Sequence, residues 1–328
     1  MAPSRLPGFL LGRLVKAAIV ILAIVICNFF LIHAAPGDPA SIIAGQSGAA
    51  DARFLEQLRA QFGLDQPLYV QLWLYLKGVL TLDLGFSHRQ QMPVATLLWE
   101  RLPATLLLTG AAFLLAITAG VAMGALAARR VGGWGDTLIT VLALTFYATP
   151  LFWVGLMLVL LFSVTLEWLP SFGMASVGVE LHGAALALDV ARHMVLPVLT
   201  LGLFYVAVYA RLTRATMLEV ADQDFVKTAR AKGVPEGRIL RRHILRNALL
   251  QVITFAGIQA GQLVGGSILV ETVFAWPGIG RLAFEALLAR DYQVLMGVFF
   301  CTSVMVVLFN LATDLLYAVV DPRVEASP

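Results

Sequence analysis

The sequence predicts an all-α polytopic membrane protein with six transmembrane helices, and three observations point to this class. Of 328 residues, 59% are hydrophobic and 13% are charged, whereas soluble domains carry about 25% charged residues. The mean hydropathy is +0.85. Several apolar runs also reach about 20 residues, the length that a helix needs to cross a hydrocarbon core. Each run is expected to be helical, because lipid cannot satisfy backbone polar groups.

Six apolar runs reach this length. They lie at residues 14–34, 104–128, 137–164, 193–213, 250–272 and 292–320. The first run is longer than the 7–15 residues of a signal-peptide core, so we interpret it as a retained helix. We therefore expect a first part, residues 1–103, with one helix and a segment on the outer side. Residues 104–328 would then hold the other five helices.

The charges in the loops predict that both termini are cytoplasmic. Residues 211–249 contain nine Lys or Arg and four Asp or Glu, whereas the loops at 165–192 and 272–291 contain three Arg in all. Because cytoplasmic loops are enriched in Lys and Arg, the 211–249 loop is expected inside. The long segment 35–103 has five basic residues, but long loops follow this rule poorly. The positive charge thus reflects membrane orientation and does not indicate nucleic-acid binding.

Several function classes lack their sequence patterns. No Gly-Lys pair occurs, so the chain has no phosphate-binding P-loop. The five histidines are scattered singly, and none belongs to a metal-binding motif such as HExxH. We therefore predict no catalytic and no metal-binding residues. The spans are poor in ionisable groups, which ion-driven carriers use at membrane depth, although an autonomous channel or secondary carrier stays open as an alternative.

The cytoplasmic loop 214–249 has the pattern of a folded element. Asp222 and Asp224 are suited to cap a helix over residues 225–232, which are good helix formers. Gly233 can end that helix in the left-handed conformation. The first half of the loop is therefore predicted to be a short helix with a glycine turn.

A second helix is expected over residues 235–247, because Pro235 suits a first helical turn. A helix pair of this kind on the inner membrane face is typical of a docking element. The alternative is that the loop is basic only because Lys and Arg gain about 1 kcal/mol each beside anionic lipid headgroups. The turn and the helix starts favour docking.

Motifs along nearly the whole chain carry a family resemblance. In order they are APGDPA (35–40), FGLDQPLYVQ (62–71), LDLGFS (82–87), ERLPATLLL (100–108), LPVLTL (196–201), DFVKTARAKG (224–233), RHILRNALL (242–250), VETVFAWPGIGRL (270–282), ARDYQVLMG (289–297) and DLLYAVVDPRV (314–324). Together they resemble the integral-membrane permease subunits of ATP-binding-cassette (ABC) importers of the dipeptide, oligopeptide and nickel type. Many relatives have Pro after NALL, whereas this chain has Gln251, so a helix break there stays open.

The resemblance implies a type I ABC importer permease-like fold in the bacterial inner membrane. It also implies a second homologous permease subunit as heterodimer partner, one or two cytoplasmic ATPase subunits and a periplasmic binding protein. The chain itself would bind no cofactor, because ATP and Mg²⁺ are held by the ATPase. Peptides are the expected substrate, with nickel, glutathione or another small solute as alternatives. The implied ATPase-docking residues are Lys227, Thr228, Ala229, Arg230, Ala231 and Gly233.

Two further features are interpreted from the residues. Phe274, Trp276, Pro277 and Gly278 precede a short predicted helix over 281–288, within a loop at 272–291. Pro and Gly favour a loop that dips back at the outer face. Family resemblance makes it a candidate outer gate, and an anchor in the membrane interface is the alternative, because Trp and Phe favour that position.

Glycines in the fifth run are spaced by four residues, at Gly257, Gly261 and Gly265. This spacing allows close helix packing, either within the chain or against a second permease subunit. Gly120 and Gly124 repeat the spacing in the second run, where packing within the chain is expected.

Overall fold

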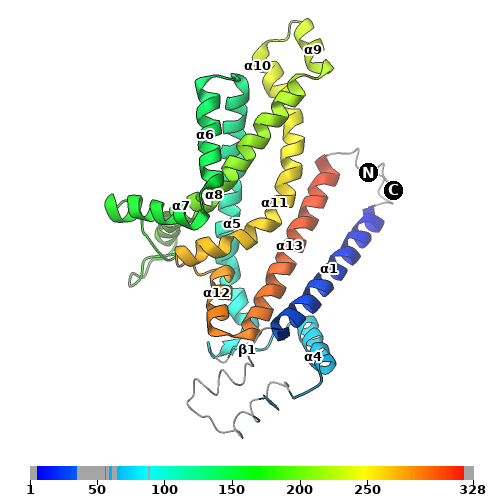
Figure 1. The fold of residues 1–328 in the computed structure, drawn as a ribbon, viewed down its shortest axis with the longest axis vertical. Helices are drawn as coiled ribbons and strands as arrows, with labels where there is room; N and C mark the ends of the chain where they lie inside the picture. The colour runs from blue at the N-terminus through cyan, green and yellow to red at the C-terminus, as the bar shows by residue number, and fades with distance from the viewer. Residues whose placement is uncertain (1–5, 35–55, 57–58, 61–64, 88, 321–328) are drawn as a thin grey trace. The chain divides into compact units, whose positions relative to one another are not determined.

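The structure, a computed structural model, describes residues 6–34, 56, 59–60, 65–87 and 89–320, and most of them are helical (Figure 1). The α-helices are α1 (Leu6–Ala34), α4 (Leu68–Thr81), α5 (Val94–Arg129), α6 (Trp134–Ala148), α7 (Leu151–Leu158), α8 (Ala184–Ala221), α9 (Asp224–Ala231), α10 (Glu236–Arg238), α11 (Arg246–Val273), α12 (Ile279–Ala289) and α13 (Tyr292–Val320). Two π-helical segments are η1 (Val159–Thr165) and η2 (Ile239–Leu245). A two-residue antiparallel pair joins β1 (Phe86–Ser87) to β2 (Met92–Pro93). The predicted all-helical class is confirmed.

Four helices of the described chain are long and apolar enough to cross a membrane, or five if the bent pair formed by α6 and α7 counts as one span. They include parts of α1, α5, α8 and α13, and they cover the first, second, fourth and sixth predicted runs. The fifth run, 250–272, lies within α11, which is not among these four in the described part of the chain. The motif APGDPA and residues 321–324 lie outside the described residues.

The third predicted run, 137–164, was wrong as one straight helix. The chain bends by 107° between α6 and the following helical segment. Pro150 explains the break, because a proline ring disfavours the helical conformation in the residue before it. Thr149 accordingly has an extended backbone, with φ −84° and ψ 134°.

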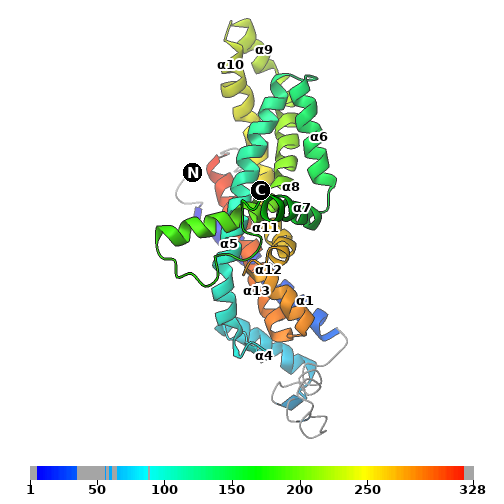
Figure 2. The same cartoon turned by 90° about the vertical axis from the view of Figure 1, so that its left-hand side faces the viewer.

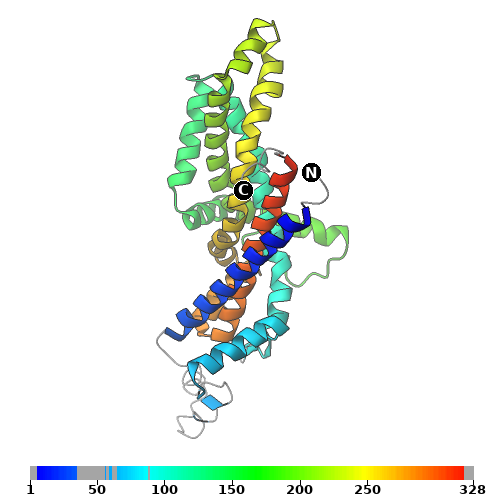
Figure 3. The ribbon, with the colours of Figure 1, turned by 90° about the vertical axis from the view of Figure 1, so that its right-hand side faces the viewer.

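The chain divides into two compact units, and the first comprises residues 1–103 and 278–308. In this unit α4 is held beside α1 (Figure 3). The rings of Phe29 and Tyr75 stack at 5.9 Å, and 3.0 Å separates His33 Nε2 from Gln71 Oε1. The β1–β2 pair is tied to the start of α13, since the backbone N–H of Phe86 donates to Gln293 Oε1 at 2.9 Å.

The second unit comprises residues 104–277 and 309–328 and holds the main apolar core. Helices α6, α7 and α11 all pack against α8. The α5 backbone approaches α8 so closely that a Cβ at Gly120 or Gly124 would meet Tyr209 or Ala210. The predicted packing of these two glycines within the chain is therefore confirmed. Figure 2 shows α9 and α10 beyond the ends of α8 and α11.

Candidate docking site

Helix α9 begins one residue away from the predicted caps. Its N-cap is Gln223, and no side chain caps it. Asp222 stays in the helical conformation at the end of α8, with φ −86° and ψ −6°, so it is not positioned to cap α9. Asp224 lies in the first turn of α9, where its carboxylate opposes the positive end of the helix dipole and accepts a hydrogen bond from Lys227 Nζ at 3.0 Å.

The turn at Gly233 has the predicted left-handed conformation, with φ +74°. The Gly233 N–H donates to the Arg230 carbonyl at 2.9 Å, and the Val234 N–H donates to the Ala229 carbonyl at 3.2 Å. These bonds satisfy carbonyls at the end of α9. A Cβ at position 233 would meet nothing within 4 Å. The backbone conformation, and not a lack of space for a side chain, therefore favours glycine here.

The second helix of the loop was predicted to end at Asn247, and this was wrong. Pro235 is the N-cap of α10, and the chain then runs through η2 into α11, which continues to Val273. No break occurs at Gln251, because a glutamine supplies the backbone N–H that a proline would lack. The loop thus ends in one long helical arm that continues to Val273.

The inner face of the loop is apolar and buried. Val226 and Ala229 of α9 and Ile239 of η2 pack against residues at the end of α8. The full cluster of buried residues contains Met217, Val220, Val226, Ala229, Ile239, Ile244 and Ala248. The loop at 214–249 therefore packs directly on the end of α8.

The outer face of α9 is exposed. Of the six predicted docking residues, Ala229 is buried and the other five are exposed: Lys227, Thr228, Arg230, Ala231 and Gly233. Phe225, whose side chain is 40% exposed, extends this surface and was not predicted. Sequence spacing would place Phe225 on the side of the buried Ala229, four residues further on, so the sequence carries no signal for its exposure. We call Phe225, Lys227, Thr228, Arg230, Ala231 and Gly233 the docking face.

Two exposed ion pairs stabilise this loop locally. Arg230 Nε donates to Glu236 Oε1 at 2.9 Å across the glycine turn, and Lys227 pairs with Asp224 within α9. Exposed pairs of this kind contribute about 0–1 kcal/mol each. Several other basic side chains stay exposed on the loop: Lys232, Arg238, Arg241, Arg242 and Arg246. The loop therefore presents a positive surface to an acidic partner or to anionic lipid.

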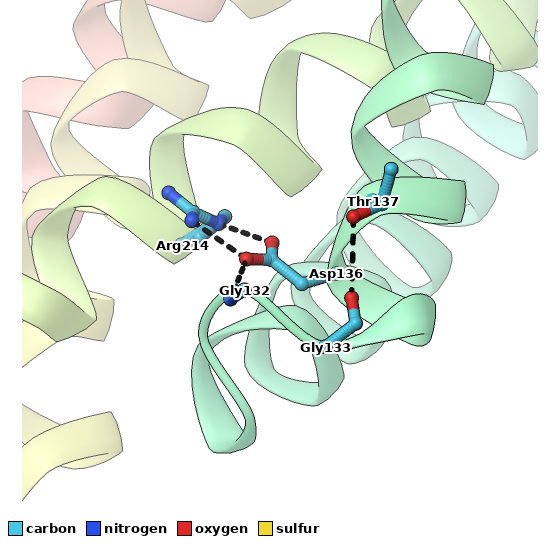
Figure 4. Close-up of polar contacts among 5 residues, drawn as sticks. All are labelled: Gly132, Gly133, Asp136, Thr137 and Arg214. Carbon is cyan, nitrogen blue, oxygen red and sulfur yellow. Dashed lines mark hydrogen bonds and ion pairs between the residues drawn. The ribbon is translucent and has the colours of Figure 1, made fainter.

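A partly buried ion pair lies near the base of the loop, and Figure 4 shows it. Asp136, 6% exposed at the start of α6, accepts two hydrogen bonds from Arg214 of α8, through Nε and through Nη2, the latter at 2.8 Å. The Gly132 N–H donates to the same carboxylate at 2.9 Å. The Arg214 side chain is 29% exposed, so the pair is only partly shielded from solvent.

The predicted outer gate has a buried aromatic core. Trp276 is fully buried, and its Nε1 donates to the Ala104 carbonyl at 2.8 Å. Phe274 is also buried, and its carbonyl accepts from the Gly173 N–H at 2.8 Å. Both rings are enclosed by protein, whereas an anchor in the membrane interface would expose its rings. Beyond Pro277 and Gly278, α12 covers the short helix that was predicted over 281–288.

The glycines of α11 lie in different environments. A Cβ at Gly257 would collide with Thr313 of α13, so this glycine packs within the chain. Gly261 is buried. Gly265 is exposed, and a Cβ there would meet nothing within 4 Å. Across the described residues, no group of three His, Cys, Asp or Glu side chains could hold a metal ion.

Comparison with known proteins decides the family. Residues 120–326 match the family described as binding-protein-dependent transport system inner membrane component, and residues 6–109 match its N-terminal counterpart. The chain belongs to this family. It is therefore a multi-pass component of the inner membrane and the non-catalytic permease subunit of an ABC transporter, with an ATPase and a binding protein as partners. No cofactor belongs to this subunit.

Individual relatives agree with this assignment. The permease is 41% identical over 97% of its length to a putative peptide transport system permease protein of Brucella abortus, of which it covers 99%. It is 40% identical, again over 97%, to the dipeptide transport system permease protein DppB of Escherichia coli, of which it covers 98%. Its fold resembles that of the MetNI methionine ABC transporter in an inward-facing conformation, with a TM-score of 0.54, 20% identity, and coverage of 69% of this chain and 96% of that one.

Proposed function

We propose that this permease forms half of the translocation path of an ATP-driven peptide importer, and that the docking face binds the cytoplasmic ATPase. The observation that carries the docking proposal is the division of α9 into two sides. One side is fixed by buried contacts to α8, and the other is exposed. An ATPase bound to the exposed side of α9 would therefore move α8 through the buried contacts between α9 and α8.

Peptides are the proposed substrate. The relatives with about 40% identity that are described above are named for peptide or dipeptide transport. Nickel is less favoured, since no metal-holding cluster occurs in the described residues. Glutathione and other small solutes are tested as competitors in the experiment below.

We further propose six membrane-spanning segments with both termini in the cytoplasm. In this arrangement α11 provides the span that covers 250–272, and the bent α6–α7 pair provides another. We also propose a boundary between an N-terminal part, 1–103, and a core, 104–328; the compact units likewise divide after Pro103, although residues 278–308 group with the first unit. A cytoplasmic loop at 214–249 and an outer loop at 272–291 complete this organisation.

The heterodimer partner is proposed to be a second permease subunit that packs on α11. The exposed Gly265 supports this contact, because a bare backbone allows a second helix to approach closely. Phe274, Trp276, Pro277 and Gly278 are proposed as the outer gate. Their support is the tight turn between α11 and α12, in which two aromatic rings are held by the core.

Gly233 provides the test of this proposal. Gly233→Val forces a β-branched residue into a left-handed conformation, at a cost of about 1–3 kcal/mol. Gly233→Asn is the matched control, since asparagine tolerates this conformation. In proteoliposomes with the second permease, the ATPase and the binding protein, uptake of a labelled dipeptide should be lost with Val and kept with Asn.

Two results would contradict the proposal. Equal uptake with valine and with wild type would show that the turn does not organise docking. Dipeptide uptake by the purified chain alone, without ATPase, would show an autonomous carrier. Competition by unlabelled nickel, glutathione or dipeptide in the same assay identifies the substrate class.

A further inference from the structure

The Asp136–Arg214 pair joins three elements at one point. Asp136 belongs to α6, Arg214 to α8, and Gly132 to the turn that follows α5. Arg214 binds the carboxylate through two nitrogens, so the contact fixes orientation as well as distance. A Cβ at Gly124 of α5 would also press on the Arg214 backbone. The ends of α5, α6 and α8 are thereby locked into one block (Figure 4).

The docking loop rests on this block. Met217 and Val220 follow Arg214 on the same helix within two turns, and both are buried in the cluster that holds α9. Ala125 and Ala128 of α5 pack against that cluster as well. A displacement of α9 would therefore reach α5 and α8 through apolar contacts, and it would reach α6 through the packing of α6 on α8 and through the ion pair.

We propose that Asp136 and Arg214 are positioning residues for transport, which transmit movement of the docking loop to α6 and its bent continuation. This inference rests on the proposed docking of an ATPase at α9. Apolar contacts can slide, whereas a two-nitrogen contact with a buried carboxylate holds one geometry. Helix α6 also packs on α8, where the rings of Tyr147 and Phe204 stack, so the role of the ion pair is to fix the relative orientation of the two helices during movement.

The test changes the geometry of the contact between residues 136 and 214 and keeps the positive charge at position 214. Arg214→Lys retains the cation but loses the planar fork. The matched control is Arg211→Lys, one turn earlier on α8, which also contacts α6 but does so over the face of the Tyr147 ring, 5.4 Å from its centre, and not through a carboxylate. Both variants are assembled into the complete transporter, and two quantities are measured: the amount of ATPase bound, and the dipeptides transported per ATP hydrolysed.

We expect Arg214→Lys to bind the ATPase at the wild-type level while transport per ATP falls by about fivefold or more, the usual range of coupling between sites. Arg211→Lys should leave this ratio unchanged. The double variant Asp136→Asn with Arg214→Gln should lower the ratio no further than Asp136→Asn alone, because each change removes the same contact.

An unchanged ratio in Arg214→Lys and in the double variant would overturn the inference. A second result would also overturn it. If uptake fell only as much as the amount of assembled complex fell, the pair would serve the stability of the complex and not the transmission of movement. Failure of the wild-type chain to bind any ATPase would instead refute the proposed docking, so the two failures are distinguishable.

Discussion

The proposed docking loop, 214–249, and the proposed outer loop, 272–291, both contain a turn between helices, but the residues at the two turns differ in exposure. Each has a glycine-containing turn between two helices. At the docking loop the residues beside the turn are exposed, and only small apolar side chains hold α9 to α8. At the outer loop, by contrast, Phe274 and Trp276 are enclosed in the core. One turn therefore presents a surface to a partner, whereas the other fixes the chain to itself.

This difference predicts opposite effects of mutation. Trp276→Ala removes a fully buried indole, and such a change costs about 3–5 kcal/mol of stability. We expect a large fall in the thermal denaturation temperature of the purified chain in detergent. Trp168→Ala is the control, since that side chain is 68% exposed. Equal denaturation temperatures for the two variants would contradict the structural role of the outer loop.

The hydrogen bond can be separated from the ring. Trp276→Phe keeps most of the buried apolar volume and loses the donor to the Ala104 carbonyl. We expect it to cost about 0.5–1.5 kcal/mol, the usual contribution of a hydrogen bond. A loss as large as that of Trp276→Ala would place the stability in the hydrogen bond and not in burial.

A much smaller effect is expected at the docking loop. Arg230→Gln removes the exposed pair with Glu236, which contributes about 0–1 kcal/mol, so the denaturation temperature should hardly change. ATPase binding should weaken nonetheless, because Arg230 lies on the docking face. Glu236→Gln removes the same ion pair by changing a residue that lies outside the docking face, so it serves as the control. Equal ATPase affinities for the two variants would remove Arg230 from the docking face.

The sequence predicts those features that depend on local chemistry. The apolar runs predict helices because lipid forbids other backbone states, and Gly233 predicts its turn because few other residues adopt that conformation. The bend before Pro150 was also available from the sequence, since a proline disfavours a helical residue before it. The span prediction overlooked it.

Contacts between distant segments could not be predicted in this way. Asp136 and Arg214 are 78 residues apart, and each reads as an ordinary charge near the end of an apolar run. Trp276 beside a proline and a glycine resembles an interfacial residue, and only its contact with the Ala104 carbonyl reveals that it is buried. The turn at Gly233 was more predictable than these contacts because its conformation is decided by neighbouring residues within the loop 214–249.

The central claim is that the exposed side of α9 binds the ATPase, and protection of Thr228 tests it most directly. In a chain freed of Cys27 and Cys301, a single cysteine introduced by Thr228→Cys is labelled with a maleimide, with and without ATPase. Val177→Cys is the control, because Val177 is 99% exposed in the loop between η1 and α8. We predict that the ATPase slows labelling at position 228 by about tenfold or more and leaves position 177 unchanged, as expected for a residue enclosed in an interface. Equal labelling of position 228 in both states would contradict the account.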